Sequence, residues 1–116
     1  MAGEVVTVAG RLQKSEKAAA TSHDIRLYVP NGVARAQIDR VIASDGTNNT
    51  ATCYVFVESG GMLYHVASLT LTTAGVWYGS NGRFWIYAGE ALLFRFSSVS
   101  ANDVLTAAVI GTAELA

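Results

Sequence analysis

The chain has 116 residues, of which 51% are hydrophobic and 15% are charged, and its formal net charge is −1. This is the length of one domain that can bury a core, and the composition excludes a disordered chain. Eight basic residues against nine acidic ones give no electrostatic footprint for nucleic acid or for an anionic membrane surface.

The first 24 residues differ in composition from the rest, because they hold both lysines, Lys14 and Lys17, and a polar, alanine-rich stretch. We predict a short strand over residues 4–8, followed by an extended connection. One interpretation is an ordinary first strand with a long loop. The other is an arm that adds a strand to the exposed sheet edge of a neighbouring subunit. Residues 11–20 lack β formers, so a single helical turn or a loose arm also fits this segment.

Short glycine-containing pairs then divide the chain at fairly even intervals. Asn-Gly and Asp-Gly pairs supply the positive φ angles of tight turns, so each pair predicts a chain reversal. The pairs are Asn31-Gly32, Asp45-Gly46, Gly60-Gly61, Ala74-Gly75, Asn81-Gly82 and Gly89-Glu90.

Segments rich in β-branched and aromatic residues lie between these turns. Arg40 breaks the alternation of its segment, which predicts a bulge or an edge there. The predicted strands are residues 25–29, 33–43, 50–58, 62–67, 69–73, 76–78, 83–88, 91–96 and 104–110. The sequence therefore predicts an all-β fold, an antiparallel β-sandwich or jelly roll of about eight to nine short strands with an extended N-terminal arm. Residues 1–24 form the N-terminal strand or arm, and residues 25–116 the sandwich domain.

Cys53 is the only cysteine, so a disulfide within the chain is impossible. It alternates with Ala51, Val55 and Val57, which predicts a buried, inert thiol. The start of the chain lacks the positive region of a signal peptide, and no apolar run approaches the ~20 residues that cross a bilayer. We expect a soluble protein made in the cytoplasm of its host.

Two aromatic segments, residues 76–78 and 83–87, flank Asn81-Gly82 and are predicted to form one hairpin. In the second segment Phe84 and Ile86 share one face. Three roles remain open for the residues on the opposite face: burial in the sandwich, a protein interface, or a platform for stacking sugars. The candidate interface residues are Val5, Val6, Val8 and Leu12 in the N-terminal segment, and Trp77, Tyr78, Arg83, Trp85 and Tyr87 in the aromatic segments.

Catalytic and metal-binding motifs are missing from the sequence. His23 and His65 belong to no metal-ligand spacing, and no phosphate-binding loop or nucleophile elbow occurs. Asp39 and Asp45 could converge as paired carboxylates, but a turn explains Asp45 and the polar face of a strand explains Asp39. We therefore expect no enzyme activity and no cofactor, catalytic or metal site.

Three stretches resemble small β-sandwich proteins encoded among the structural genes of tailed bacteriophages. Residues 27–34 (LYVPNGVA) resemble the "L-Y-x-V-P-x-G" opening, with one residue fewer between Tyr28 and Pro30. Residues 87–94 (YAGEALLF) resemble the "x-A-G-D/E-x-L" turn and strand, and residues 111–115 (GTAEL) resemble the last strand. The resemblance covers residues 25–115, and the N-terminal segment has no counterpart in it.

This resemblance implies a homo-oligomeric virion subunit, and our leading hypothesis is a capsid decoration, or cement, protein. Its partners would be the major capsid protein and further copies of itself, as a homo-trimer or homo-dimer, with no nucleic acid and no membrane. It would lie on the capsid exterior at junctions between capsomers. The alternatives are a tail, neck or head-fibre subunit and, in another class, a carbohydrate-binding module using Trp77, Trp85 and Tyr87.

Overall fold

The computed structural model describes residues 7–116, and only the backbone of Thr7 and Val8. Within this range the chain forms eight strands and no helix, hence no helix that could span a membrane. The strands are β1 (Thr7–Lys17), β2 (Ser22–Tyr28), β3 (Val33–Asp45), β4 (Ala51–Ser59), β5 (Met62–Leu71), β6 (Tyr78–Tyr87), β7 (Ala91–Ser97) and β8 (Val104–Leu115).

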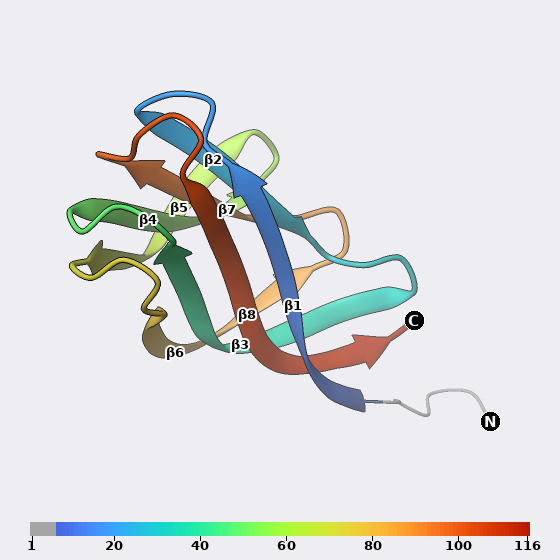
Figure 1. Ribbon diagram of the computed structural model, residues 1–116. Coiled ribbons are helices and arrows are strands. Elements are labelled where there is room, and N and C mark those ends of the chain that lie inside the picture. The colour runs from blue at the N-terminus through green and yellow to red at the C-terminus, as the bar shows by residue number, and fades with distance from the viewer. Residues whose placement is uncertain (1–6) are drawn as a thin grey trace.

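The strands form two four-stranded antiparallel sheets that face each other (Figure 1). The first sheet has the order β1-β8-β3-β6, and the second has the order β2-β7-β4-β5. Successive strands alternate between the sheets, except that β4 and β5 form a hairpin within the second sheet. This strand order is that of an eight-stranded jelly roll, so the predicted fold class is confirmed.

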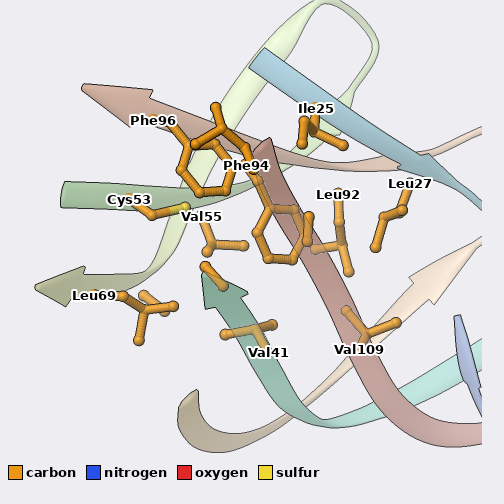
Figure 2. Close-up of a cluster of buried hydrophobic side chains, with 14 of the residues drawn as sticks. Ile25, Leu27, Val41, Cys53, Val55, Leu69, Leu92, Phe94, Phe96 and Val109 are labelled. Carbon is orange, nitrogen blue, oxygen red and sulfur yellow. The ribbon is translucent and has the colours of Figure 1, made fainter. Parts of the chain in front are cut away.

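The core lies between the sheets and is built from the inward side chains of both (Figure 2). Phe94 on the central strand β7 pairs in register with Ile25 on one side and Val55 on the other, and all three are fully buried. Val41 and Val109 face them from the first sheet. Each such side chain contributes about 1.5–3 kcal/mol through burial.

The N-terminal segment differs from its prediction over the described residues. Residues 7–17 form one continuous edge strand that pairs with β8 from Thr7↔Glu114 to Lys17↔Val104. No helical turn or loose arm forms there, because the ladder with β8 runs along the whole strand and Ser15 bonds Thr106 on the outer face at 2.8 Å. The boundary between residues 24 and 25 falls inside β2. The predicted strand over residues 4–8 lies mostly outside the described residues.

The turn predicted at Asn81-Gly82 is wrong, and with it the aromatic hairpin. Both residues lie within the single strand β6, and Gly82 does not have a positive φ. Asn81 pairs with Arg40 on β3, where the register shifts between Ile38 and Arg40, so the predicted bulge near Arg40 is confirmed. The strands predicted over residues 62–67 and 69–73 are likewise one strand, β5.

The β4–β5 reversal at Gly60-Gly61 is confirmed. The φ angles of the two glycines are 58° and 79°, so both central residues are left-handed. This is the requirement of a type I′ turn, whose twist matches that of the two strands it joins. Gly60-Gly61 therefore fixes the register of the hairpin from Ser59↔Met62 onward.

Candidate interaction surfaces

The first candidate surface is the outer face of β6. Arg83, Trp85 and Tyr87 point outward together, as the alternation predicts, while Ile86 is buried and Phe84 packs against the core. The Tyr87 side chain is 49% exposed, and Arg83 lies 3.6 Å from Asp39. Three of the nine candidate interface residues therefore form one cluster.

Trp85 is fixed in this cluster by Arg35 on the neighbouring strand β3. The Arg35 guanidinium lies 4.0 Å from the Trp85 ring centroid, a cation–π distance. The same guanidinium donates two hydrogen bonds, of 2.6 and 3.1 Å, to the Glu114 carboxylate. The hydrogen bonds to Glu114 raise the pKa of Arg35 above its ordinary value. One face of the indole is therefore occupied by a fixed cation.

The other candidate residues lie elsewhere. Trp77 precedes β6 at its opposite end and is 44% exposed, with the Arg11 guanidinium 5.9 Å from its ring. Tyr78 packs against the core, and its hydroxyl bonds Thr72 at 3.0 Å, which lowers its pKa. Leu12 is on β1 at the end of the sandwich. Val8 pairs with Ala113, and Val5 and Val6 lie outside the described residues.

A second surface, which the sequence pattern does not predict, is the exposed first half of the edge strand β5. All five residues from Met62 to Val66 are exposed, and burial begins to alternate only at Ala67. Met62 is 59% and Tyr64 56% exposed. The strand carries no charged residue, although native edge strands usually carry charges or prolines that prevent pairing. The sequence shows only that the five residues directly after Gly60-Gly61, MLYHV, do not alternate between apolar and polar side chains, which does not reveal that they are exposed.

An aromatic group on the second sheet borders this segment. The His65 ring lies 6.3 Å from the Tyr54 ring and 5.6 Å from the Phe56 ring, and its Nε2 is 2.8 Å from the Ser68 hydroxyl. One polar atom of the exposed His65 ring is therefore satisfied by a local contact three residues along the strand. We call residues 62–66 together with Tyr54 the β5 edge surface.

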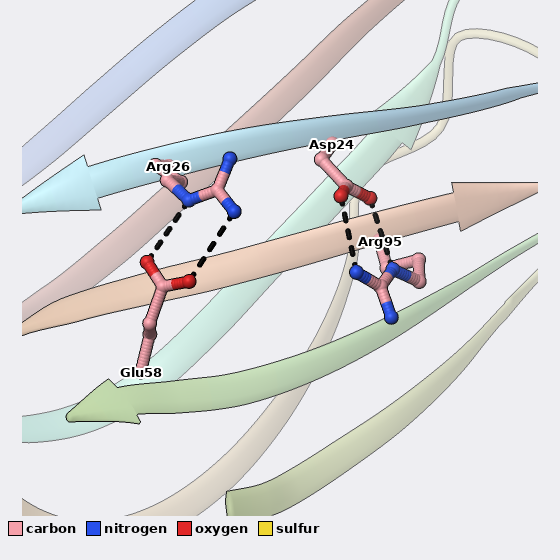
Figure 3. A network of polar contacts seen from close by, with 4 residues as sticks. All are labelled: Asp24, Arg26, Glu58 and Arg95. Atoms are coloured by element: carbon pink, nitrogen blue, oxygen red, sulfur yellow. Dashed lines mark hydrogen bonds and ion pairs between the residues drawn. The ribbon is translucent and has the colours of Figure 1, made fainter. Parts of the chain in front are cut away.

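Four charged residues on the outer face of the second sheet are paired with one another (Figure 3). Arg26 donates to both oxygens of Glu58 at 2.9 and 3.2 Å, and Arg95 donates to both oxygens of Asp24 at 3.1 Å. The hydrogen bonds from Arg26 lower the pKa of Glu58. Leu93 points outward between Arg26 and Phe56 but is fully buried, because these long side chains cover it.

Asp39 and Asp45 do not form the carboxylate pair that the sequence analysis considered and set aside. They lie six residues apart along β3, about 20 Å in an extended strand, and Asp39 contacts Arg83. Asp45 is instead beside Asp103, and Thr47 bonds both carboxyl groups. Among residues 7–116 no three potential metal ligands cluster.

Burial is the largest cause that raises the pKa of Asp45, and the neighbouring Asp103 raises it further. Hydrogen bonds from the backbone N–H groups of Thr47 and Asn48 lower this pKa but do not outweigh the burial. Burial also acts to raise the pKa of Asp103, but hydrogen bonds from Thr47, Ser100 and Asp45 outweigh it and lower that pKa. The two carboxyl groups therefore differ in acidity, and Asp45 is the one that keeps its proton to higher pH.

No protein-family model matches the sequence, and no curated protein matches it. Among solved structures, the chain is similar to a subunit of Bacillus endospore appendages, a family of disulfide-linked pili, with a TM-score of 0.59 and 14% identity. That match covers 98% of this chain and 93% of the other. A match to the infectious bursal disease virus particle has a TM-score of 0.31 and 10% identity over 97% of this chain and 39% of the other.

The similarity to the Bacillus protein agrees with the observed fold and shows nothing beyond the fold. The first similarity extends over nearly the whole of both chains, and the second is too distant to support an argument. The chain is a jelly-roll β-sandwich whose described surface offers an uncharged sheet edge and an aromatic cluster.

Proposed function

We propose that the protein is a structural subunit of a tailed-phage virion, a capsid decoration protein that binds the outside of the shell at junctions between coat-protein capsomers. The observation that carries this proposal is the β5 edge surface. An edge strand with five consecutive exposed residues, four of them hydrophobic and none of them acidic, lysine or arginine, is a liability for an isolated protein and a docking site in an assembly. The resemblance of residues 25–115 to phage structural proteins is our reason for proposing a virion as this assembly.

The mechanism is passive. The buried core and the antiparallel ladders make a stiff subunit, and its arginine–carboxylate pairs are satisfied within the chain, so the contact energy comes from burying apolar area. A subunit that touches two or more capsomers gains avidity, because each later contact forms at high effective concentration. This binding energy exists only in the assembled shell and therefore stabilises that state.

Two further observations support a structural role. The near-neutral net charge of −1 lets many copies crowd together without strong repulsion. The similar Bacillus protein builds pili, so a jelly roll of this size serves there as a repeated building block. Neither observation distinguishes a capsid from a tail, which is the task of the experiment.

The test uses particles of the parent phage assembled without this protein. Purified wild-type protein should bind them at a copy number on the scale of the coat protein and raise the temperature at which the shell opens. The double variant Met62→Glu/Tyr64→Glu should lose this binding, while the matched control Val76→Glu/Val104→Glu, at positions of 43% and 46% exposure, should keep it. Binding of a few copies at one vertex or at the tail would instead show a tail, neck or head-fibre subunit.

The carbohydrate-binding alternative has less support, because Arg35 covers one face of Trp85 and Arg11 lies near Trp77. Binding assays with the particles and with host polysaccharide decide between the two functions. Wild-type protein that binds the polysaccharide but not the particles, together with a Trp85→Ala variant that loses the polysaccharide, would favour the sugar-binding module over the decoration protein.

A further inference from the structure

The first sheet bends near Asp39, where Ile38 of β3 pairs with Gly111 of β8. A pocket lies beside this bend. Both ladders of β3 shift register between Ile38 and Arg40, and β8 contributes Gly111 opposite Ile38. A Cβ at Gly111 would overlap the carbonyl oxygen of Gln37, so only glycine allows this approach. Beyond the bend, the ends of β3, β8 and β1 extend past the second sheet (Figure 1).

The inward face of this extension is apolar and only partly covered. It lines a pocket of about 290 Å³ together with residues 27–30, where β2 ends. The lining includes Ala36, Val109 and Ala113, and at Gly10 a Cβ would meet nothing within 4 Å. We call this the end pocket. Three large hydrophobic side chains of its lining remain exposed: Leu12 by 37%, Tyr28 by 62% and Leu115 by 42%.

The chain itself carries a segment of matching chemistry beside the pocket. Thr7 pairs with Glu114, next to the lining residue Leu115, so residues 1–6 connect to the molecule at this end. Their sequence, MAGEVV, places Val5 and Val6 directly before β1. Two adjacent valines suit a small apolar pocket, which lies at the lower limit of the volumes that hold drug-sized ligands, about 300–1,000 Å³.

The valines of the same chain cannot reach the pocket without a reversal. Gly10, Arg11 and Leu12 line the pocket and lie later in β1, so the residues before Thr7 would have to turn back alongside the strand. A tight reversal uses two residues, and here these would be the valines themselves. Valine is strongly disfavoured at the positive φ angles of such turns. The valines of a neighbouring copy have no such restriction.

We propose that Val5 and Val6 of one copy occupy the end pocket of a neighbouring copy. This contact links copies of the chain to one another. It goes beyond the proposed binding of the shell, which uses the β5 edge surface on the other sheet. On a capsid it would join decoration subunits into a network.

The test mixes two full-length variants under mild oxidation. Each carries one introduced cysteine, Val5→Cys in the first and Tyr28→Cys in the second. Cys53 is fully buried and does not compete. Peptide mass spectrometry should find a disulfide between the two introduced thiols in a product of two chains. Its yield should exceed by about tenfold that of Val5→Cys mixed with Val104→Cys, because only the first pair is held at high effective concentration. Val104 is 46% exposed at the far end of β8.

Equal yields from the two mixtures would overturn the proposal. So would a disulfide within one chain as the main product of the double variant Val5→Cys/Tyr28→Cys at high dilution, because the valines would then fill their own pocket. A second measurement is light scattering, in which Val5→Asp/Val6→Asp should abolish self-association at concentrations where the wild type associates. Binding of this variant to particles through the β5 edge surface is measured separately, so the two proposals can fail independently.

Discussion

Asp45 and Asp103, at the ends of different strands, share one threonine between their buried carboxyl groups. Thr47 Oγ1 is 2.5 Å from Asp103 Oδ1 and 3.4 Å from Asp45 Oδ1, and the two aspartates are 7% and 1% exposed. Asp45 Oδ2 has no other partner among the described residues. A proton on Asp45 that is donated to the Asp103 carboxylate satisfies this atom, in agreement with the raised pKa of Asp45.

Stability should therefore fall as the pH rises through the pKa of folded Asp45. In the unfolded chain Asp45 ionises near its ordinary value of 3.8, whereas the folded state keeps the proton to higher pH. The folded state thus binds more protons, and the free energy of unfolding decreases with pH in that window. Asp45→Asn retains the donor and the acceptor without the charge. It should remove this decrease and stabilise the protein by about 1 kcal/mol above the window.

Calorimetric melting of both proteins from about pH 4 to about pH 8 checks this prediction. Asp103 contributes with the opposite sign, because its pKa is lowered and its contribution is lost as the pH falls through that folded value. The decrease at higher pH therefore belongs to Asp45 alone. An Asp45→Asn variant that melts lower than the wild type throughout would contradict the shared proton.

Replacing Arg35 by lysine should loosen the β6 cluster. Lysine cannot donate the paired hydrogen bonds to Glu114 and stack flat on Trp85 at the same time. The variant should therefore melt at a slightly lower temperature than the wild type, by a small amount because the site is partly exposed. In a Trp77→Phe background, Trp85 emission should also shift to the red. Arg83→Lys, on a side chain that is 79% exposed, is the matched control and should change neither quantity.

Glycine substitutions test the bend and the corrected hairpin together. Gly111→Ala should destabilise the protein by more than about 2 kcal/mol, because its Cβ overlaps the backbone of Gln37. Gly82→Ala should remain within about 0.5 kcal/mol of the wild type, because its Cβ meets nothing within 4 Å and its φ is not positive. If Asn81-Gly82 formed a tight turn, Gly82→Ala would be strongly destabilising. Urea unfolding of the two variants measures both effects.

The sequence alone predicts the features that are local. Alternation around Cys53 places that strand, Gly60-Gly61 places its turn, and the break at Arg40 places the bulge. Each depends on side-chain parity or on the φ angle that one residue permits, so neighbours in the sequence are sufficient.

Features that depend on partners distant in the sequence could not be found in this way. Asn81-Gly82 has the composition of a turn, but β3 supplies a complete ladder opposite it, and pairing overrides the local preference. The exposure of Met62–Val66 follows from how far the β4–β5 hairpin extends, which no periodicity encodes. The carboxyl pair joins the end of β3 to the start of β8, and its two aspartates look in the sequence like ordinary turn residues.

Cys53 should behave as a reporter of global unfolding. Its side chain is fully buried beside Phe96, and burial raises the pKa of the thiol far above its ordinary value, so almost no thiolate exists at neutral pH. Reaction with a thiol reagent should therefore occur only when the core opens. If the opened state reacts faster than it recloses, the rate should not depend on the reagent concentration.

Phe94→Ala should accelerate the reaction strongly, since it removes about 3–5 kcal/mol from the same core. Tyr54→Ala, which truncates a 42% exposed ring on the outer face of the same strand as Cys53, should leave the rate nearly unchanged. Rapid labelling of the native wild type would place Cys53 at a surface and would contradict the packing of the second sheet.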